Sequence, residues 1–210
     1  PQMLLTDPPY CSGGFQESGR STGSVGRTGG FKEIANDKLS TRGYKALIKS
    51  VLDSYETQLA YIFTDWRMWV YLFDVVESSG YGVRSMIPWV KEGPALGQGW
   101  RAQHEIIMFA NKGKVKFDPS KSHGNVIFAN RTGNVHHTTE KPVSILETIL
   151  KVTDFAQTVV DPFTGSGTTL LACENHGREF FGCELSPAYC DVVVSRWQEM
   201  TGEKAKKIKS

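Results

Sequence analysis

The sequence predicts an α/β fold, a doubly wound and mostly parallel sheet with helices on both faces. Short apolar runs alternate along the chain with longer segments whose apolar residues recur three and four positions apart. This alternation is typical of parallel sheets built from strand and helix units. Of the 210 residues, 40% are hydrophobic and 22% are charged, which allows a globular core. The sequence contains no run of about 18 apolar residues, which excludes a membrane-spanning helix.

The expected strands are short apolar runs that end at turn residues. They lie at residues 3–6, 59–63, 85–87, 105–110, 158–160 and 180–183. We expect the run at 105–110 to pair with residues 114–117.

The expected helices carry their apolar residues on one face. Residues 69–76 have apolar side chains at i, i+3, i+4 and i+7, which predicts an amphipathic helix that ends near Gly80. Similar patterns predict further helices at residues 43–55, 145–150, 168–175 and 187–197. Ser186 and Pro187 suit the N-cap and the first position of the last helix.

We expect residues 1–210 to form one domain with a Gly-rich loop at residues 11–35. Seven glycines and almost no large apolar residues lie between Gly13 and Gly30. Such a segment buries too little apolar surface to offset its ordering entropy, which predicts a mobile surface loop. A loop of this length is either functional or a tolerated insertion.

The charge is nearly balanced overall but unevenly distributed. The net charge is +2, whereas eight basic and three acidic side chains lie between Arg84 and Arg131. This region suits contact with phosphates, and a solvated basic face is the alternative. The four cysteines form no C-x-x-C pair and are interpreted as reduced thiols of a cytosolic protein.

A strand, a glycine-containing turn and a helix follow one another at residues 159–169. In a doubly wound sheet, ligands bind at the carboxyl ends of the strands, where glycines let the backbone approach closely. Glu184 ends the next strand about 20 residues further on, where it can accept hydrogen bonds from ribose hydroxyls. Together these features predict a nucleoside cofactor. No Gly-Lys-Ser/Thr sequence follows the turn, so phosphate chemistry is not expected.

A second motif, Asp7-Pro8-Pro9-Tyr10, directly follows the first expected strand. Asp-Pro-Pro alone is often a simple turn. Here a carboxylate, a proline carbonyl and an aromatic ring meet at the carboxyl end of a buried strand. This set suits a planar base with an exocyclic amine, since carboxylate and carbonyl accept its two N–H bonds while the ring stacks on it.

Both motifs resemble those of the exocyclic-amino DNA methyltransferases. Asp-Pro-Pro-Tyr at 7–10 resembles the catalytic motif, and Phe-Thr-Gly-Ser-Gly at 163–167 resembles the cofactor motif. Their order resembles the circularly permuted β group of the family. His-Thr-Thr-Glu-Lys-Pro at 137–142 resembles the His-Pro-Thr-Gln-Lys-Pro stretch that precedes the cofactor strand there, with Thr138 and Glu140 as departures. The resemblance extends over essentially the whole chain and includes the segment 101–105.

The resemblance implies a Rossmann-like methyltransferase fold and S-adenosylmethionine as cofactor. Asp7 and the Pro8 carbonyl would localise the lone pair of the target amine toward the methyl group, with no covalent intermediate. C5-cytosine methylation would need a Pro-Cys thiol, and Cys11 lacks that context. The implied catalytic residues are Asp7, Pro8, Pro9 and Tyr10. The implied cofactor-binding residues are Thr6, Asp7, Lys141, Pro142, Asp161, Pro162, Phe163, Gly165, Ser166, Gly167, Thr168 and Glu184.

The expected partner is double-stranded DNA, with the target base flipped out of the helix. Residues 84–135 are then a candidate target-recognition region. The candidate DNA-binding residues are Arg20, Arg27, Lys32, Lys91, Arg101 and Arg131. No metal site is expected, because no Cys or carboxylate spacing accompanies His136 and His137. We expect no membrane partner and leave a homodimer open.

The resemblance favours transfer to N6 of adenine, because Asp rather than Ser precedes Pro-Pro-Tyr. N4 of cytosine is the first alternative. A catalytically silent nucleic-acid-binding subunit is the second, and a methyltransferase for a small molecule or a protein glutamine is the third. In the family, an acidic residue near the adenine of the cofactor precedes the catalytic strand. We expect it upstream of residue 1, in a prokaryotic or phage-encoded cytoplasmic enzyme, unless cofactor binding is completed otherwise.

Overall fold

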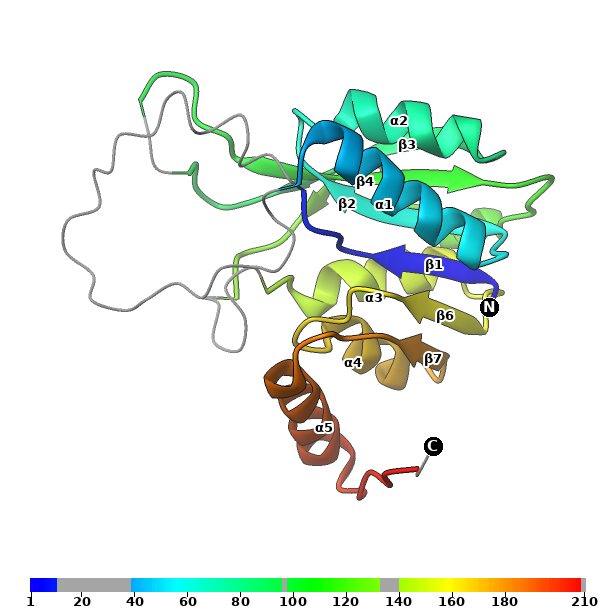
Figure 1. Cartoon of the computed structure of the whole chain (residues 1–210), viewed down its shortest axis with the longest axis vertical. Coiled ribbons are helices and arrows are strands. Elements are labelled where there is room, and N and C mark those ends of the chain that lie inside the picture. Colours follow the sequence, from blue (N-terminus) through cyan, green and yellow to red (C-terminus); the bar gives the residue numbers. More distant parts are fainter. Residues whose placement is uncertain (11–38, 96–97, 133–139, 209–210) are drawn as a thin grey trace.

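The computed structural model describes residues 1–10, 39–95, 98–132 and 140–208. Its seven-stranded sheet has the order β5-β3-β4-β2-β1-β6-β7 (Figure 1). The strands are β1 Met3–Thr6, β2 Leu59–Thr64, β3 Gly82–Val90, β4 His104–Asn111, β5 Ile127–Phe128, β6 Thr158–Asp161 and β7 Glu179–Gly182. The helices are α1 Thr41–Ser54, α2 Trp69–Ser78, α3 Val143–Val152, α4 Thr168–Asn175 and α5 Pro187–Thr201, with a short 3₁₀ turn at Pro119–Lys121.

The sheet is mostly parallel, as the sequence predicts. The pairs β1–β2, β1–β6, β6–β7 and β3–β5 are parallel, whereas β4 runs antiparallel to both of its neighbours. The carboxyl ends of the other six strands therefore share one edge with the amino end of β4, and we call it the carboxyl edge. In Figure 1 the arrowheads of β1, β6 and β7 point to this side, at the left of the view.

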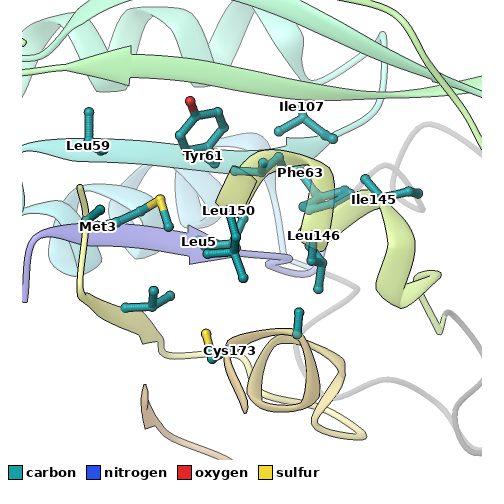
Figure 2. Close-up of a cluster of buried hydrophobic side chains, with 14 of the residues drawn as sticks. Met3, Leu5, Leu59, Tyr61, Phe63, Ile107, Ile145, Leu146, Leu150 and Cys173 are labelled. Carbon is teal, nitrogen blue, oxygen red and sulfur yellow. The ribbon is translucent and has the colours of Figure 1, made fainter. Parts of the chain in front are cut away.

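The core has two halves, because the strands are buried on both faces and successive side chains point to opposite sides. Met3 and Leu5 of β1 belong to a cluster with residues of α3 and α4, which Figure 2 shows in close-up. Leu4 between them belongs to the other cluster, together with residues of α1 and α2. The helices thus cover both faces of the sheet, and the α/β fold class is confirmed.

The expected pairing of residues 114–117 with the run at 105–110 is wrong. Both edges of β4 are taken, one by β2 and the other by β3, so no further strand can add to it. Val115 and Phe117 instead pack against the core from an irregular segment. The short strand β5 carries only one buried residue, Ile127, and the sequence pattern did not predict it.

Helix termini agree with the sequence to within a few residues. The first helix begins at Thr41 rather than at Gly43, because the Ser40 side chain caps it by accepting a hydrogen bond from the Gly43 amide at 3.2 Å. Ser186 does occupy the N-cap position of α5, but its side chain makes no capping hydrogen bond. Within the described ranges, no helix is both long and apolar enough to cross a membrane.

Candidate active site

The carboxyl edge gathers acidic side chains from four separate segments. Asp7 follows β1, Asp161 ends β6 and Glu184 follows β7. Glu105 reaches the same edge from the amino end of β4, because β4 runs in the opposite direction. The Asp-Pro-Pro-Tyr motif and the glycine-containing turn, predicted to be catalytic and cofactor-binding, both lie at this edge.

Asp7 lies against the ammonium group of Lys141. The Lys141 Nζ is 2.5 Å from Asp7 Oδ2 and 3.3 Å from Glu105 Oε2, and its side chain is only 8% exposed. It also lies 5.4 Å from the ring centroid of Tyr10 and 5.5 Å from that of Phe63. The ammonium is thus held between two carboxylates and two aromatic rings.

Tyr10 is anchored to the same carboxylate as Lys141. Its hydroxyl donates a hydrogen bond of 2.8 Å to Glu105 Oε2. Lys91, which follows β3, forms an ion pair with the other oxygen, Glu105 Oε1. Glu105 therefore joins Lys91, Tyr10 and Lys141 in one network.

The electrostatics of this network set the protonation states. Burial raises the pKa of Asp7, and the nearby charge of Glu105 adds to this while Lys141 opposes it. Burial also raises the pKa of Glu105, but Lys141 and Lys91 outweigh it and lower that pKa to about 2. Burial, followed by the negative charge of Asp7, raises the pKa of Tyr10, which keeps its hydroxyl a donor. Glu105 is consequently a permanent anion that fixes its partners.

Hydrogen bonds to Asp161 link the end of β6 to β1 and α4. Its carboxylate accepts hydrogen bonds from the hydroxyls of Thr6 at 2.7 Å and Thr169 at 2.6 Å, and from the Phe163 amide at 3.1 Å. Burial raises its pKa to about 6 despite these bonds. Thr6 and Asp161, both predicted to bind the cofactor, are therefore joined directly across the two strands that carry the motifs.

The turn after β6 has the shape that a closely approached ligand needs. Gly165 and Gly167 have positive φ values of 54° and 87°, a region that side-chain-bearing residues rarely adopt. Glu184 accepts hydrogen bonds from the Gly165 amide at 2.9 Å and the Ser186 amide at 2.8 Å. Each carboxylate oxygen keeps a second lone pair for a ribose hydroxyl. The residues of this turn therefore fit a nucleoside cofactor.

A buried ion pair connects the cofactor turn to the segment before α3. Arg196 of α5 donates to the Ser166 carbonyl at 2.8 Å and to the Ser166 hydroxyl at 3.0 Å. The same guanidinium pairs with Glu140 at 2.9 Å, and the two side chains are 12% and 4% exposed. Glu140 thus turns toward the cofactor turn while its neighbour Lys141 turns toward Asp7.

The remaining predicted cofactor and catalytic residues lie along the same edge. Pro8 and Pro9 continue from β1, Pro142 is the N-cap residue of α3, Pro162 begins the turn and Thr168 begins α4.

The candidate DNA-binding residues are only partly brought together. Lys91, Arg101 and Arg131 follow β3, precede β4 and follow β5, so all three belong to connections at the carboxyl edge. Lys91 is ion-paired there and its side chain is 13% exposed, whereas Arg101 and Arg131 are exposed. The other basic residues of the region lie at the opposite edge, near the start of β3 or on the connection from β4 to β5. Arg20, Arg27, Lys32, His136 and His137 lie outside the described residues, as does the whole predicted Gly-rich loop at residues 11–35.

Arg84 and Lys114 lie at the opposite edge of the sheet, beside the carboxyl end of β4. They line a depression with Phe109, Asn111 and Phe117. The basic stretch between Arg84 and Arg131 is therefore not one continuous face around the Asp7 site.

Sequence reasoning missed four residues of the site. Glu105 and Glu140 fell inside recognised segments but received no role, and Thr169 and Arg196 received none either. The only available signal was the departure from the family pattern at Glu140, since an introduced charge in a buried segment needs a partner. Arg196 lies 56 residues away in sequence, so only the fold reveals it as that partner.

The comparisons with known proteins agree with this geometry. The model of the N6/N4 DNA methylase family matches residues 2–195. A methylase by name, YubD of Escherichia coli (strain K12), is 28% identical over 188 residues, covering 89% of this chain and 77% of YubD. The type II methyltransferase M2.DpnII of Streptococcus pneumoniae is 27% identical over 220 residues, covering 92% of this chain and 81% of that protein.

Solved structures also resemble the chain. M1.HpyAVI has a TM-score of 0.66 and 25% identity over 93% of this chain and 87% of its own. Its complex with S-adenosylmethionine has a TM-score of 0.63 at the same identity, over 93% and 88%. The cytosine-N4-specific PvuII DNA methyltransferase has a TM-score of 0.69 at 17% identity over 93% and 79%, a likeness of fold alone. With its Asp-Pro-Pro-Tyr and glycine motifs on one edge, the chain belongs to the N6/N4 family of S-adenosylmethionine-dependent DNA methyltransferases.

Proposed function

We propose that this enzyme methylates the N6 amine of adenine within a specific sequence of double-stranded DNA. The observation that carries the proposal is the Asp7 carboxylate, which directly follows β1 and lies close to the Tyr10 hydroxyl. Asp at this position favours adenine by family resemblance. The type II methyltransferase names of relatives support a role in DNA modification.

The chemical difficulty lies with the acceptor amine, whose lone pair is delocalised into the base. When bound, S-adenosylmethionine would supply the methyl group from its sulfonium, and the sulfur would keep the electron pair of the broken bond as a thioether. Asp7 and the Pro8 carbonyl each accept one N–H of the amine, and this localises its lone pair toward the methyl carbon. As the N–C bond forms, the nitrogen becomes positive, and Asp7 stabilises that charge and accepts the surplus proton.

The target atom is inaccessible inside a duplex, so the base is flipped into the site. Tyr10 is the stacking face, and its hydrogen bond to Glu105 fixes the plane of its ring. The turn at residues 163–167 would hold the cofactor, and Glu184 would accept hydrogen bonds from its ribose hydroxyls.

The base and the reaction are tested together by mass spectrometry. Purified enzyme, S-adenosylmethionine and genomic DNA from a methylation-deficient host are incubated, and the hydrolysed DNA is expected to contain N6-methyladenine. N4-methylcytosine without N6-methyladenine would reassign the base but keep the mechanism. No methylated base, with the cofactor bound normally in calorimetry, would favour a silent nucleic-acid-binding subunit.

The role of Asp7 is tested with Asp7→Ala. We expect turnover to fall at least about 10²-fold while cofactor binding stays largely intact, because the lost contact acts mainly in the transition state. Asp53→Ala is the matched control, since Asp53 is an exposed carboxylate of α1 whose side chain is 55% exposed. An Asp7→Ala enzyme with normal turnover would rule out this role.

Arg101 and Arg131 are proposed to contact DNA phosphates near the flipped base. Both are exposed on connections at the carboxyl edge. Replacing both by Ala is expected to weaken DNA binding and to reduce the slope of log affinity against log salt by about 2, one per phosphate contact. An unchanged slope would move the DNA surface elsewhere.

A further inference from the structure

Lys141 was expected from family resemblance to bind the cofactor, but its ammonium lies on the catalytic carboxylate. It is 2.5 Å from Asp7 Oδ2 and 3.3 Å from Glu105 Oε2, with a side chain that is 8% exposed. A buried ammonium needs such charged partners to offset its desolvation. Asp7 and Glu105 both belong to the target-base side of the site, where Glu105 also holds the Tyr10 hydroxyl.

The two oxygens of Asp7 are not equivalent. Oδ2 accepts the hydrogen bond from Lys141. Oδ1 is buried and has no hydrogen-bond partner among the residues that the structure describes. A buried acceptor without a donor is costly, and at a catalytic position it marks the place of a substrate donor. The target amine would supply that donor.

Charge places a second demand on Lys141. The titratable groups that interact with Asp7 are Lys141, Glu105, Tyr10 and Asp161. Lys91 lies one contact further away, on Glu105. Of these, Lys141 provides the positive charge in contact with Asp7. Without it, burial and the charge of Glu105 would favour the protonated acid. A protonated carboxyl group carries an O–H donor on one oxygen and has less capacity to accept hydrogen bonds.

We propose that Lys141 is a positioning residue for methyl transfer: anchored on Glu105, its ammonium holds Asp7 Oδ2 and leaves Oδ1 ionised to accept an N–H of the target amine. This role rests on the proposed function. Glu105 contributes by holding Lys141 and the Tyr10 hydroxyl on the same oxygen, Oε2. The stacking ring and the accepting carboxylate are thereby fixed relative to each other.

The test is the pH dependence of turnover at saturating cofactor and DNA. In Lys141→Met, the midpoint of the acidic limb should rise by at least about one pH unit, since an opposite charge in contact shifts a carboxylate by about one to three units. At pH values well below the wild-type midpoint, turnover should fall about 10-fold for each pH unit by which the midpoint rises, and it should recover at higher pH. Lys141→Arg keeps the charge and should keep the wild-type midpoint. Lys141→Gln repeats the test if the Met variant unfolds early in a thermal melt.

Lys91→Met is the matched control. Lys91 also pairs with Glu105, but its partner in the network is Oε1 rather than Asp7. Its acidic midpoint should therefore move by less than about half a pH unit, whatever its effect on DNA affinity.

Two results would overturn the role of Lys141. An unchanged acidic midpoint in Lys141→Met, with weaker cofactor binding in calorimetry, would return Lys141 to the cofactor site. A uniform loss of turnover at every pH would show a structural role only. Both presuppose an active wild-type enzyme. A wild-type protein that methylates no base would overturn the proposed function itself and this role with it.

Discussion

At the scale of the residue, neighbours give two buried carboxylates opposite properties. Burial raises the pKa of Asp161 to about 6, because its partners are hydroxyls and an amide that carry no charge. Two lysines lower the pKa of Glu105 to about 2, although burial acts in the other direction. The carboxyl group of Asp161, at the end of β6, therefore binds a proton near pH 6, whereas that of Glu105, near the start of β4, stays ionised.

Glu184 has a structural and a proposed ligand-binding role, and variants can separate them. We expect Glu184→Ala to weaken S-adenosylmethionine binding at least about 10-fold, since it removes the ribose acceptor and the bonds from the Gly165 and Ser186 amides. Glu184→Gln keeps one acceptor oxygen and should bind with intermediate affinity. Calorimetry measures both, with the exposed Glu179 of β7 changed to Ala as control. Equal affinities for wild type and Glu184→Ala would remove the ribose assignment.

At the scale of the element, two segments bring distant residues to the carboxyl edge. The antiparallel direction of β4 delivers Glu105 from its amino end, beside the carboxyl end of β2. Helix α5 delivers Arg196, which contacts both Ser166 and Glu140. Neither contribution follows from the strand and helix pattern alone, since each depends on how an element is placed against the sheet.

The contacts of Arg196 with Ser166 and Glu140, which we call the α5 contacts, are predicted to control cofactor affinity. Arg196→Met removes two hydrogen bonds to Ser166 and the ion pair with Glu140, so it should loosen the turn and weaken S-adenosylmethionine binding about 10-fold. It should also lower the free energy of unfolding by about 3 kcal/mol, the usual result of breaking a buried pair. Arg196→Lys keeps the charge without the forked donors and should restore affinity only in part.

The control for the α5 contacts is Arg178→Met. Arg178 donates to the Asp154 carbonyl at 2.6 Å, so this variant also loses an arginine that bonds to the main chain. It should lower stability without changing cofactor affinity. A similar loss of cofactor affinity in both variants would mean that the loss comes from general destabilisation and not from the α5 contacts.

At the scale of the whole molecule, stability should depend on pH through Asp161. Its folded-state pKa of about 6 exceeds the ordinary value of 3.8, so the folded state binds a proton more tightly than the unfolded state. The stabilisation is therefore complete below pH 3.8 and is lost as pH rises through 6, a change of about 3 kcal/mol. Asp161→Asn should lack this fall between pH 4 and pH 7.

Glu105 provides the opposite dependence in the same molecule. Its folded-state pKa of about 2 lies below 4.5, so it stabilises the fold above pH 4.5 and loses this effect as pH falls through 2. Urea unfolding from pH 2 to pH 8 measures both contributions. Glu105→Gln should lower the free energy of unfolding by about 3 kcal/mol at pH 7 and by much less near pH 2. Curves for Asp161→Asn and wild type that run parallel would contradict the assignment to Asp161.

The sequence predicted the parts of the fold that depend on local patterns. The buried strands at the two motifs are continuous apolar runs, and the helices carry apolar stripes, so both were predictable from periodicity. The expected strand at 114–117 failed, because its apolar alternation reflects packing of Val115 and Phe117 on the core rather than pairing. Strand β5 has only two residues, too few for a periodic signal.

By itself, the sequence determined the fold class, the two motifs, their placement at strand ends and the nucleoside cofactor. These follow from short-range patterns, since a strand, a turn and the following residue are adjacent in the chain. Only the tertiary structure decided which charges meet. Lys141 lies 134 residues from Asp7 in the chain, on the segment that leads through α3 to β6. The contact exists because β6 pairs with β1, while β4, which carries Glu105, lies next to β2 on the other side of β1. Buried charges take the partners that the fold brings within reach, and a linear sequence does not record those distances.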